Sequence, residues 1–323
     1  MRHFRSLAFL IAILIPLFAS AGSTVNPSSE DLLRAGKAND ARRMLDAAIQ
    51  QNPNDAEAYN LLCRLYFQLE QWDNALHMAE KSVDLAPKNS NYHLWLGRAA
   101  GRKAETANPF VAYGLARRVH SEFERAVELD GNNLPARSDL AEYYMEAPGF
   151  LGGDKKKARE QADVIAKRDP ALATYIYARL AEKQGSSRAE QEYKNAIAKS
   201  GNVSRYWIEL AYYYRRAGRV ADMETAIRQA DQAPRQGTAP EYDGAYLLLR
   251  TNRNPNAAIQ MLRRTVSDNT SSEDAPAFRV HYMLGELLEK QGDNKAAAAE
   301  FRSALEMASE FHPARDALNR ISR

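Results

Sequence analysis

A step of 34 residues separates Pro53 from Pro87, and the residues before the two prolines follow one pattern. At matching distances before each proline stand four residues of similar character: Asp40, Ala41, Leu45 and Ala48 before the first, and Asn74, Ala75, Ala79 and Ser82 before the second. A period of this length is typical of helix-turn-helix repeats, which bury their apolar faces by stacking on one another. The chain is therefore predicted to be all-α, a right-handed α-solenoid of antiparallel helix pairs.

The unit over 56–89 shows the pattern most fully. Four residues share one face of its first helix, which we call helix A: Tyr59, Leu62, Cys63 and Tyr66. Its second helix, helix B, carries the small residues Ala75, Ala79 and Ser82 before Pro87. This pattern resembles the tetratricopeptide repeat, which has an aromatic, a Leu, a small residue and a Tyr in helix A, and Ala, an aromatic or apolar residue, Ala and Pro in helix B.

The resemblance recurs along most of the chain, clearly at 207–218 and 284–304 and more weakly at 177–196 and 246–262. We expect about eight helical pairs over 29–312, after a short linker at 22–28. Beyond Pro313, Ala317, Leu318 and Ile321 follow helical spacing. A capping helix over 313–323 is predicted to cover the last repeat.

Two segments break the period. The step from Pro87 to Gly131, which occupies the place of the closing proline, is 44 residues, with the excess near 101–114. The step from Gly131 to Pro170 is 39 residues, with the excess at 147–153. Insertions in solenoids form loops or lengthened helices and often lie on a binding face.

The second insertion contains several glycines and is followed by Lys155, Lys156 and Lys157. A phosphate-binding turn is one interpretation, because anions favour helix N-termini. The segment lacks a preceding strand and the GxxxxGK[ST] spacing, and Asp154 suits the N-cap of the next helix. The alternative is an enlarged turn with Phe150 and Leu151 packed against the repeat and the lysines in solvent.

The first 21 residues have the pattern of a secretory signal peptide. Arg2 and Arg5 precede an apolar run over 7–18, and Ala19-Ser20-Ala21 offers a cleavage site. The run is shorter than the roughly 20 residues that span a bilayer, which disfavours an uncleaved anchor. The sequence predicts an exported protein, periplasmic or secreted and of bacterial type, with no stable membrane insertion after cleavage.

Charge and cysteine content narrow the classes of function. The full chain carries a formal charge of +3, which falls to +1 without the two arginines of the leader. A near-neutral chain gives no electrostatic basis for binding nucleic acid. Cys63 is the single cysteine, so no internal disulfide can form, and its place in the repeat predicts a buried spacer.

No catalytic or metal-binding constellation stands out in the sequence. The six histidines are scattered, and none belongs to an HExxH motif. His93 and His281 occupy the helix A position of Tyr59 and Trp207, which predicts a packing role. We expect no enzyme activity, no cofactor and no metal.

The concave face of a solenoid is lined by its A helices, so residues beside the core-facing set are predicted to contact a partner. These candidate groove residues are rich in arginine and aromatics, as binding hot spots are: Asn60, Arg64, Phe67, Leu94, Arg98, Arg102, Glu142, Met145, Ile208, Tyr212, Arg215, Arg216, Tyr282 and Glu286. Some similar tetratricopeptide modules clamp a peptide carboxylate with Lys, Arg and Asn, but that full set is absent here.

These patterns favour an exported, non-enzymatic scaffold that binds a protein or peptide in its groove, in the assembly or organisation of the cell envelope. Two alternatives remain open from the sequence. One is a groove that binds a small molecule or an envelope polysaccharide. The other is an enzyme whose site is assembled across repeats.

Overall fold

The computed structural model describes residues 28–235 and 240–322, so the predicted leader lies outside the described residues. This part of the chain contains seventeen α-helices, one 3-10 turn and no strand. In order, the elements are α1 Ser29–Arg34, α2 Ala38–Gln51, α3 Ala56–Gln68, α4 Trp72–Leu85, α5 Ser90–Thr106, α6 Pro109–Leu129, α7 Leu134–Glu146, η1 Gly149–Leu151, α8 Lys155–Ile165, α9 Pro170–Lys183, α10 Ala189–Lys199, α11 Ser204–Arg216, α12 Val220–Gln232, α13 Pro240–Arg250, α14 Pro255–Ser267, α15 Ala277–Lys290, α16 Asn294–Met307 and α17 His312–Ile321.

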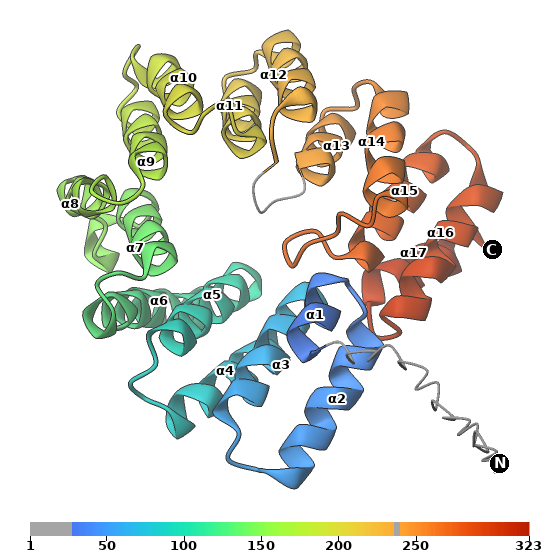
Figure 1. Ribbon diagram of the computed structural model, residues 1–323, viewed down its shortest axis with the longest axis horizontal. Coiled ribbons are helices and arrows are strands. Elements are labelled where there is room, and N and C mark those ends of the chain that lie inside the picture. Colours follow the sequence, from blue (N-terminus) through green and yellow to red (C-terminus); the bar gives the residue numbers. More distant parts are fainter. Residues whose placement is uncertain (1–27, 236–239, 323) are drawn as a thin grey trace, which may run out of the picture.

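Consecutive helices pair as A and B helices, from α1 with α2 to α15 with α16, and α17 packs against α16. The pairs stack side by side into a solenoid (Figure 1). The predicted fold class is therefore confirmed, including the short first unit and the weaker units at α9–α10 and α13–α14. The A helices face the inside of the curve and the B helices face outward (Figure 1).

Complementary side-chain volumes set the distance between the two helices of a pair. In the third and eighth pairs, a Cβ on Gly97 or Gly285 would lie 2.4 Å from the ring of Phe123 or Phe301, so these glycines make room for an aromatic of helix B. In the second pair the larger side chain is on helix A instead, where Cys63 takes the place of the glycine and helix B carries the small Ala79. Cys63 is buried, as predicted.

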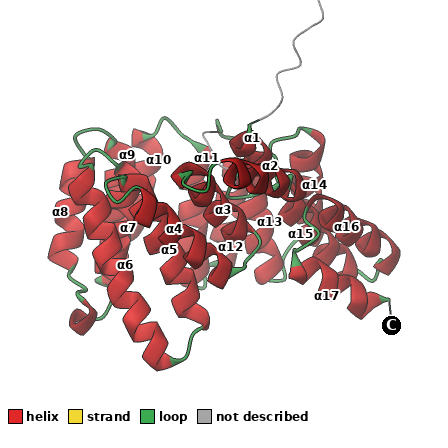
Figure 2. Cartoon of the chain, turned by 90° about the horizontal axis from the view of Figure 1, so that it is seen from below, coloured by secondary structure: helices red, strands yellow, loops and turns green. Residues whose placement is uncertain are grey.

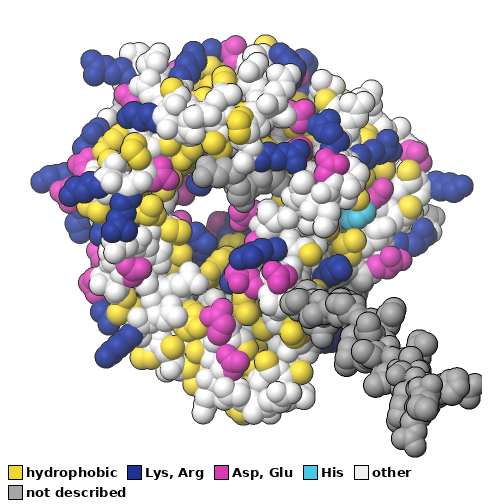
Figure 3. Space-filling view, in the orientation of Figure 1, with side chains coloured by type: hydrophobic (Ala, Val, Ile, Leu, Met, Phe, Trp, Pro, Cys, Tyr) yellow, Lys and Arg dark blue, Asp and Glu magenta, His cyan; other side chains and the backbone are white. Residues whose placement is uncertain are grey.

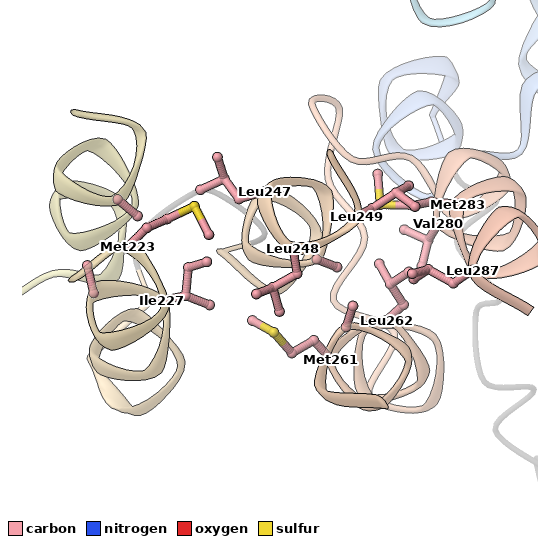
Figure 4. Close-up of a cluster of buried hydrophobic side chains, with 14 of the residues drawn as sticks. Met223, Ile227, Leu247, Leu248, Leu249, Met261, Leu262, Val280, Met283 and Leu287 are labelled. Carbon is pink, nitrogen blue, oxygen red and sulfur yellow. The ribbon is translucent and has the colours of Figure 1, made fainter. Parts of the chain in front are cut away.

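Apolar side chains from neighbouring pairs then interlock into a continuous core. Figure 4 shows one part of it, where Met223 and Ile227 of α12 face Leu248 of α13 and Met261 of α14. Val280, Met283 and Leu287 extend the cluster to α15 (Figure 4). Each pair therefore completes the core of the next, which is why the chain can be stable without disulfides.

The two period-breaking segments have different structures. The first lengthens α5 and α6, and their connecting turn projects beyond the neighbouring turns (Figure 2). The second forms η1, after which Gly152 has φ +92°. Asp154 caps α8 by accepting the Lys156 and Lys157 N–H groups, as predicted. The prediction that Phe150 packs against the repeat is wrong, since its side chain is 78% exposed, because Gly149 to Leu151 turn it outward on η1.

The solenoid also closes on itself, which the sequence did not predict. The first helices pack against the last ones and complete a ring (Figure 1). Phe278, Phe311 and Ala308 belong to the same buried cluster as Leu33 and Leu61. We call this contact between α1–α4 and α15–α17 the seam.

Polar contacts fasten the seam on its outer side. The Asn39 amide donates to the Glu306 carbonyl (2.9 Å) and accepts from the Ser309 N–H (2.9 Å). Arg42 contacts Glu310 at 3.2 Å. The predicted capping helix, α17, lies at this place, where Ala314 joins the seam cluster.

Candidate functional site in the central channel

The ring encloses a central channel, visible as an opening in the space-filling view (Figure 3). A cavity of ≈ 610 Å³ lies along its inner wall. Four A helices (α5, α7, α11 and α13), the N-cap of α9 and the loop over 268–276 contribute its polar residues: Arg98, Ser138, Asp139, Asp169, Arg205, Glu209, Tyr212, Asp243 and Asp274. The curvature of the solenoid thus brings together residues that are far apart in the sequence.

This wall carries more negative than positive charge, since five carboxylates face two guanidinium groups. Arg98 is paired with Asp139, with the Nε to Oδ2 distance at 2.6 Å. Glu209, Asp243 and Asp274 form no ion pair within the described ranges. Glu209 and Asp243 are half-buried and Asp274 is exposed at the rim, and an excess of negative charge in such a confined site is costly unless a cation compensates it.

The pKa values reflect this cost. Burial in the channel, with the nearby charge of Glu209, raises the pKa of Asp243 from 3.8 to about 7. Burial likewise raises the pKa values of the Glu209 and Asp274 carboxyls. The side chain of Glu142 is 59% exposed. Even so, the channel around it displaces water from the carboxylate, and this desolvation raises the pKa of Glu142 as well.

A second, smaller cavity of ≈ 310 Å³ adjoins the first at Arg98 and Asp139. Arginines and aromatics of α3, α4 and α5 stack around it. The Arg98 guanidinium lies 4.9 Å from the ring centre of Trp95, and Arg102 lies 4.8 Å from that of Trp72. Phe67 contacts both tryptophans edge-on, at 5.6 and 5.4 Å between ring centres. Stacking of this kind holds the arginine side chains extended, while Arg98 pairs with Asp139 and Arg102 pairs with Glu105 at 2.6 Å.

The loop over 268–276 limits the channel on one side. It connects α14 with α15 and reaches toward the centre of the ring (Figure 1). Glu273 accepts two hydrogen bonds from the buried Arg64, from Nε at 2.8 Å and Nη2 at 2.6 Å. Arg64 also contacts Glu30 of α1 at 3.1 Å. The loop is therefore fixed to the first two helix pairs.

The candidate groove residues fall into three groups. Six line the two cavities: Phe67, Arg98, Arg102, Glu142, Ile208 and Tyr212. Four others are buried: Asn60, Arg64, Leu94 and Met145. The remaining four line neither of these two cavities, and Arg216 is paired with Glu182: Arg215, Arg216, Tyr282 and Glu286. Partner binding by any of them stays a prediction.

The sequence interpretation missed the acidic wall. Glu209 directly follows the candidate groove residue Ile208, and only the actual helix rotation distinguishes the two positions. Asp139 lies three positions before the candidate Glu142 on the same helix. Asp243 and Asp274 come from a weak repeat and from a linker. The length of that linker, nine residues where most B-to-A linkers have four, was a signal in the sequence.

His93 and His281 are more than packing residues, because each binds a glutamate of the adjoining B helix. His93 Nδ1 lies 2.6 Å from Glu122, and its Nε2 lies 3.0 Å from the Pro87 carbonyl. His281 Nδ1 lies 2.7 Å from Glu300 in the equivalent place. The hydrogen bond to Glu122 raises the pKa of His93. Each pair links the two helices of its repeat.

The described residues also bear on metal binding, thiol reactivity and membrane insertion. They contain no group of three or more His, Cys, Asp or Glu side chains placed to hold a metal ion. Burial raises the pKa of the Cys63 thiol to about 12, which keeps it protonated at neutral pH. None of the helices in this part of the chain is long and apolar enough to cross a membrane.

Comparison with known proteins gives these repeats a name. Models of the tetratricopeptide repeat family match residues 32–99 and residues 242–310. The chain contains tetratricopeptide repeats. The two matches cover helix pairs that meet at the seam, and the helix pairs between them continue the same solenoid.

Solved structures resemble this tetratricopeptide-repeat solenoid at low sequence identity. Yeast Tom70 is 16% identical, with 96% of this chain and 66% of that chain covered and a TM-score of 0.52. A tetratricopeptide repeat protein from Parabacteroides merdae is 15% identical over 91% of this chain and 96% of that chain, with a TM-score of 0.43. A thermophilic TPR protein from Thermus thermophilus is 18% identical over 57% of this chain and 98% of that chain, with a TM-score of 0.47. The likeness to Tom70 supports the fold alone.

Proposed function

We propose that this protein is an exported scaffold that holds a basic, extended segment of a partner protein in its central channel, in the assembly or organisation of the cell envelope. The tetratricopeptide-repeat fold suggests a protein-interaction scaffold. The observation that carries the choice of partner is the acidic wall of the ≈ 610 Å³ cavity, where Glu209, Asp243 and Asp274 form no ion pair within the described ranges and five carboxylates face only two arginines. Lysine or arginine side chains of a partner would supply that charge.

The shape of the site favours an extended segment over a folded domain. The channel is enclosed by the ring, so a ligand must enter it end-on or as a narrow chain (Figure 3). The half-buried Tyr212 adds aromatic surface beside the carboxylates, Ile208 is buried in the same wall, and the Trp95 ring stacks on Arg98. Alternating basic and apolar side chains of a peptide would match this wall.

Peptide binding can be tested by fluorescence anisotropy. The probe is a labelled, unstructured peptide of about ten residues rich in Lys and Arg, compared with a Glu-rich peptide of equal length. The double variant Glu209→Gln/Asp243→Asn should weaken binding roughly tenfold or more, as expected for lost hydrogen bonds between charged groups. A matched variant, Asp84→Asn/Glu128→Gln, removes two exposed carboxylates from the B helices α4 and α6 and should bind like wild type. Equal affinity of all three proteins would refute the channel site.

Export needs its own measurement, because the leader lies outside the described residues. Intact-mass analysis of the protein recovered from a periplasmic fraction should show the loss of residues 1–21. A chain that keeps these residues, or that stays in the cytoplasmic fraction, would refute export and leave the channel proposal to the binding assay.

A further inference from the structure

Both insertions expose large apolar side chains at one edge of the ring. Phe110 is 92% exposed at the start of α6, and Val111 and Tyr113 are each 47% exposed. Phe150 on η1 is 78% exposed. These four are half of the eight large apolar side chains found exposed in the described part of the chain, although the two insertions are short. We call them the apolar tips.

The two insertions are joined to each other through Tyr143. Its hydroxyl lies 3.0 Å from the Ala116 carbonyl of α6 and 2.7 Å from the Leu151 carbonyl of η1. His120 of α6 stacks on the Tyr143 ring at 5.0 Å between centres. Phe110 lies six residues before Ala116, or roughly 9 Å further along α6. The apolar tips are therefore parts of one edge.

Exposed basic side chains gather at the base of the tips, although Glu105 and Glu146 precede the tips in the sequence and each pairs with a basic residue. Residues 106–116 include no charged side chain. At the base of the tips, Arg117 and the three lysines 155–157 are exposed. Arg117, Lys155 and Lys157 make no ion pair with other described residues, and Lys156 is 4.0 Å from Glu160. Asp154 is occupied as the cap of α8.

From this arrangement we infer that the apolar tips dock the ring on an anionic lipid surface. Aromatic side chains that project beyond a band of cations are the arrangement of interfacial anchors, which bury about 5–10 Å into the headgroup region. The three aromatics present about 400 Å² at the usual size of such side chains. That area is about half of the roughly 800 Å² that each partner of a standard protein complex buries. It is also divided between the start of α6 and η1, which suits a fluid surface better than a fixed protein pocket.

The inference can be tested with a local probe at the tip. Cys63 is buried and its thiol stays protonated, so a cysteine introduced by Phe110→Cys is the reactive one in the full chain. It is labelled with an environment-sensitive dye and titrated with vesicles of phosphatidylcholine, with or without about one third phosphatidylglycerol. Leu85→Cys, on α4, serves as the control because Leu85 is also exposed. The dye at position 110 should brighten and shift to the blue with anionic vesicles, and the dye at position 85 should not.

Charge and contact are then separated with variants. Replacing Lys155 or Lys157 by Gln should weaken anionic vesicle binding about fivefold each, as expected for a lysine near such a surface. Phe150→Ser should weaken it as well, whereas Met44→Ser, an exposed apolar residue of α2, should not. A silent probe at 110, an equal response at 85, or equal binding to neutral vesicles would overturn the inference. A response of the 110 probe to a membrane-free extract but not to vesicles would overturn it in favour of a protein partner.

Discussion

Replacing Gly36 by alanine should open the seam, whereas the same replacement of Gly218 should leave the ring closed. Both glycines lie in the turn between helix A and helix B, with φ of +69° and +72°. A Cβ at Gly218 would have nothing within 4 Å. At Gly36 it would lie 2.3 Å from the Ala277 nitrogen and 2.9 Å from the Pro276 carbonyl carbon, at the start of α15. The two variants therefore share the backbone strain and differ in the seam contact.

The magnitude follows from these two parts. An alanine held at positive φ costs about 1–2 kcal/mol at either position. At Gly36 the start of α15 must also retreat by about 1.2 Å to reach an ordinary contact distance of roughly 3.5 Å. Because backbone atoms cannot swing aside as the end of a side chain can, overpacking adds about 1–3 kcal/mol. The Gly36→Ala variant should lose about 2–5 kcal/mol of unfolding free energy, against about 1–2 kcal/mol for Gly218→Ala.

Two measurements separate these outcomes. Urea unfolding followed by circular dichroism gives the two free energies, and small-angle X-ray scattering reports whether the ring stays closed. Gly36→Ala should increase the radius of gyration and speed amide exchange in α1 and in the first turn of α15, with Gly218→Ala unchanged in both. Equal losses of stability and superimposable scattering curves for the two variants would show that the seam yields easily, and would refute the reasoning.

Three further predictions concern single side chains. Asp243→Asn should stabilise the protein at pH 8 by at most about 4 kcal/mol and have little effect near pH 4. The raised pKa of this carboxyl destabilises the wild-type fold progressively from about pH 4, where the unfolded chain ionises, and fully above about pH 7. A thermal-unfolding series over pH would contradict this if the variant and wild type ran parallel. His93→Gln should flatten a fall in stability that starts near pH 6.5, since a His whose pKa is raised by Glu122 stabilises the fold below that pH and loses the contribution as pH rises through its folded pKa. The check is the slope of unfolding free energy against pH, which one proton limits to about 1.4 kcal/mol per unit. Leu284→Ala should cost about 2–5 kcal/mol in denaturant unfolding, because Leu284 is buried between repeats, and a negligible loss would mean that its environment has been misread.

Local regularity made the repeat predictable. Pro53, Pro87 and the Gly97 and Gly285 positions carry a pattern that depends only on how one helix packs on the next, and such contacts lie within about one period in the sequence. The closure of the ring depends instead on a small rotation per repeat summed over eight pairs, which no single residue encodes. Contacts such as Asn39 with Glu306 join residues too far apart for any periodic pattern to indicate.

The same distinction explains the candidate site. Arg98 and Tyr212 could be nominated because A helices line the concave face, and both line the cavity. Asp243 could not be nominated from the sequence, because its surroundings include residues from other repeats and from the 268–276 loop. These segments come together only in the closed ring. Phe150 was misplaced for a local reason: a Gly-rich turn leaves the direction of its side chain open, and η1 turns it outward.

Closure of the ring changes what kind of array this solenoid is. An open stack of repeats has two ends, can fray from either, and tolerates the gain or loss of a unit because each unit contacts only its neighbours. Here the eighth pair has the first as a neighbour, since Phe278 of α15 and Leu33 of α1 belong to one buried cluster, so the array has no free end. Its repeat number is then fixed by geometry: a pair added or removed would leave Gly36 and Ala277 out of register. The fold of this chain should evolve by substitution within its units and by growth at its A-to-B turns, as at α5–α6, and not by duplication of whole repeats.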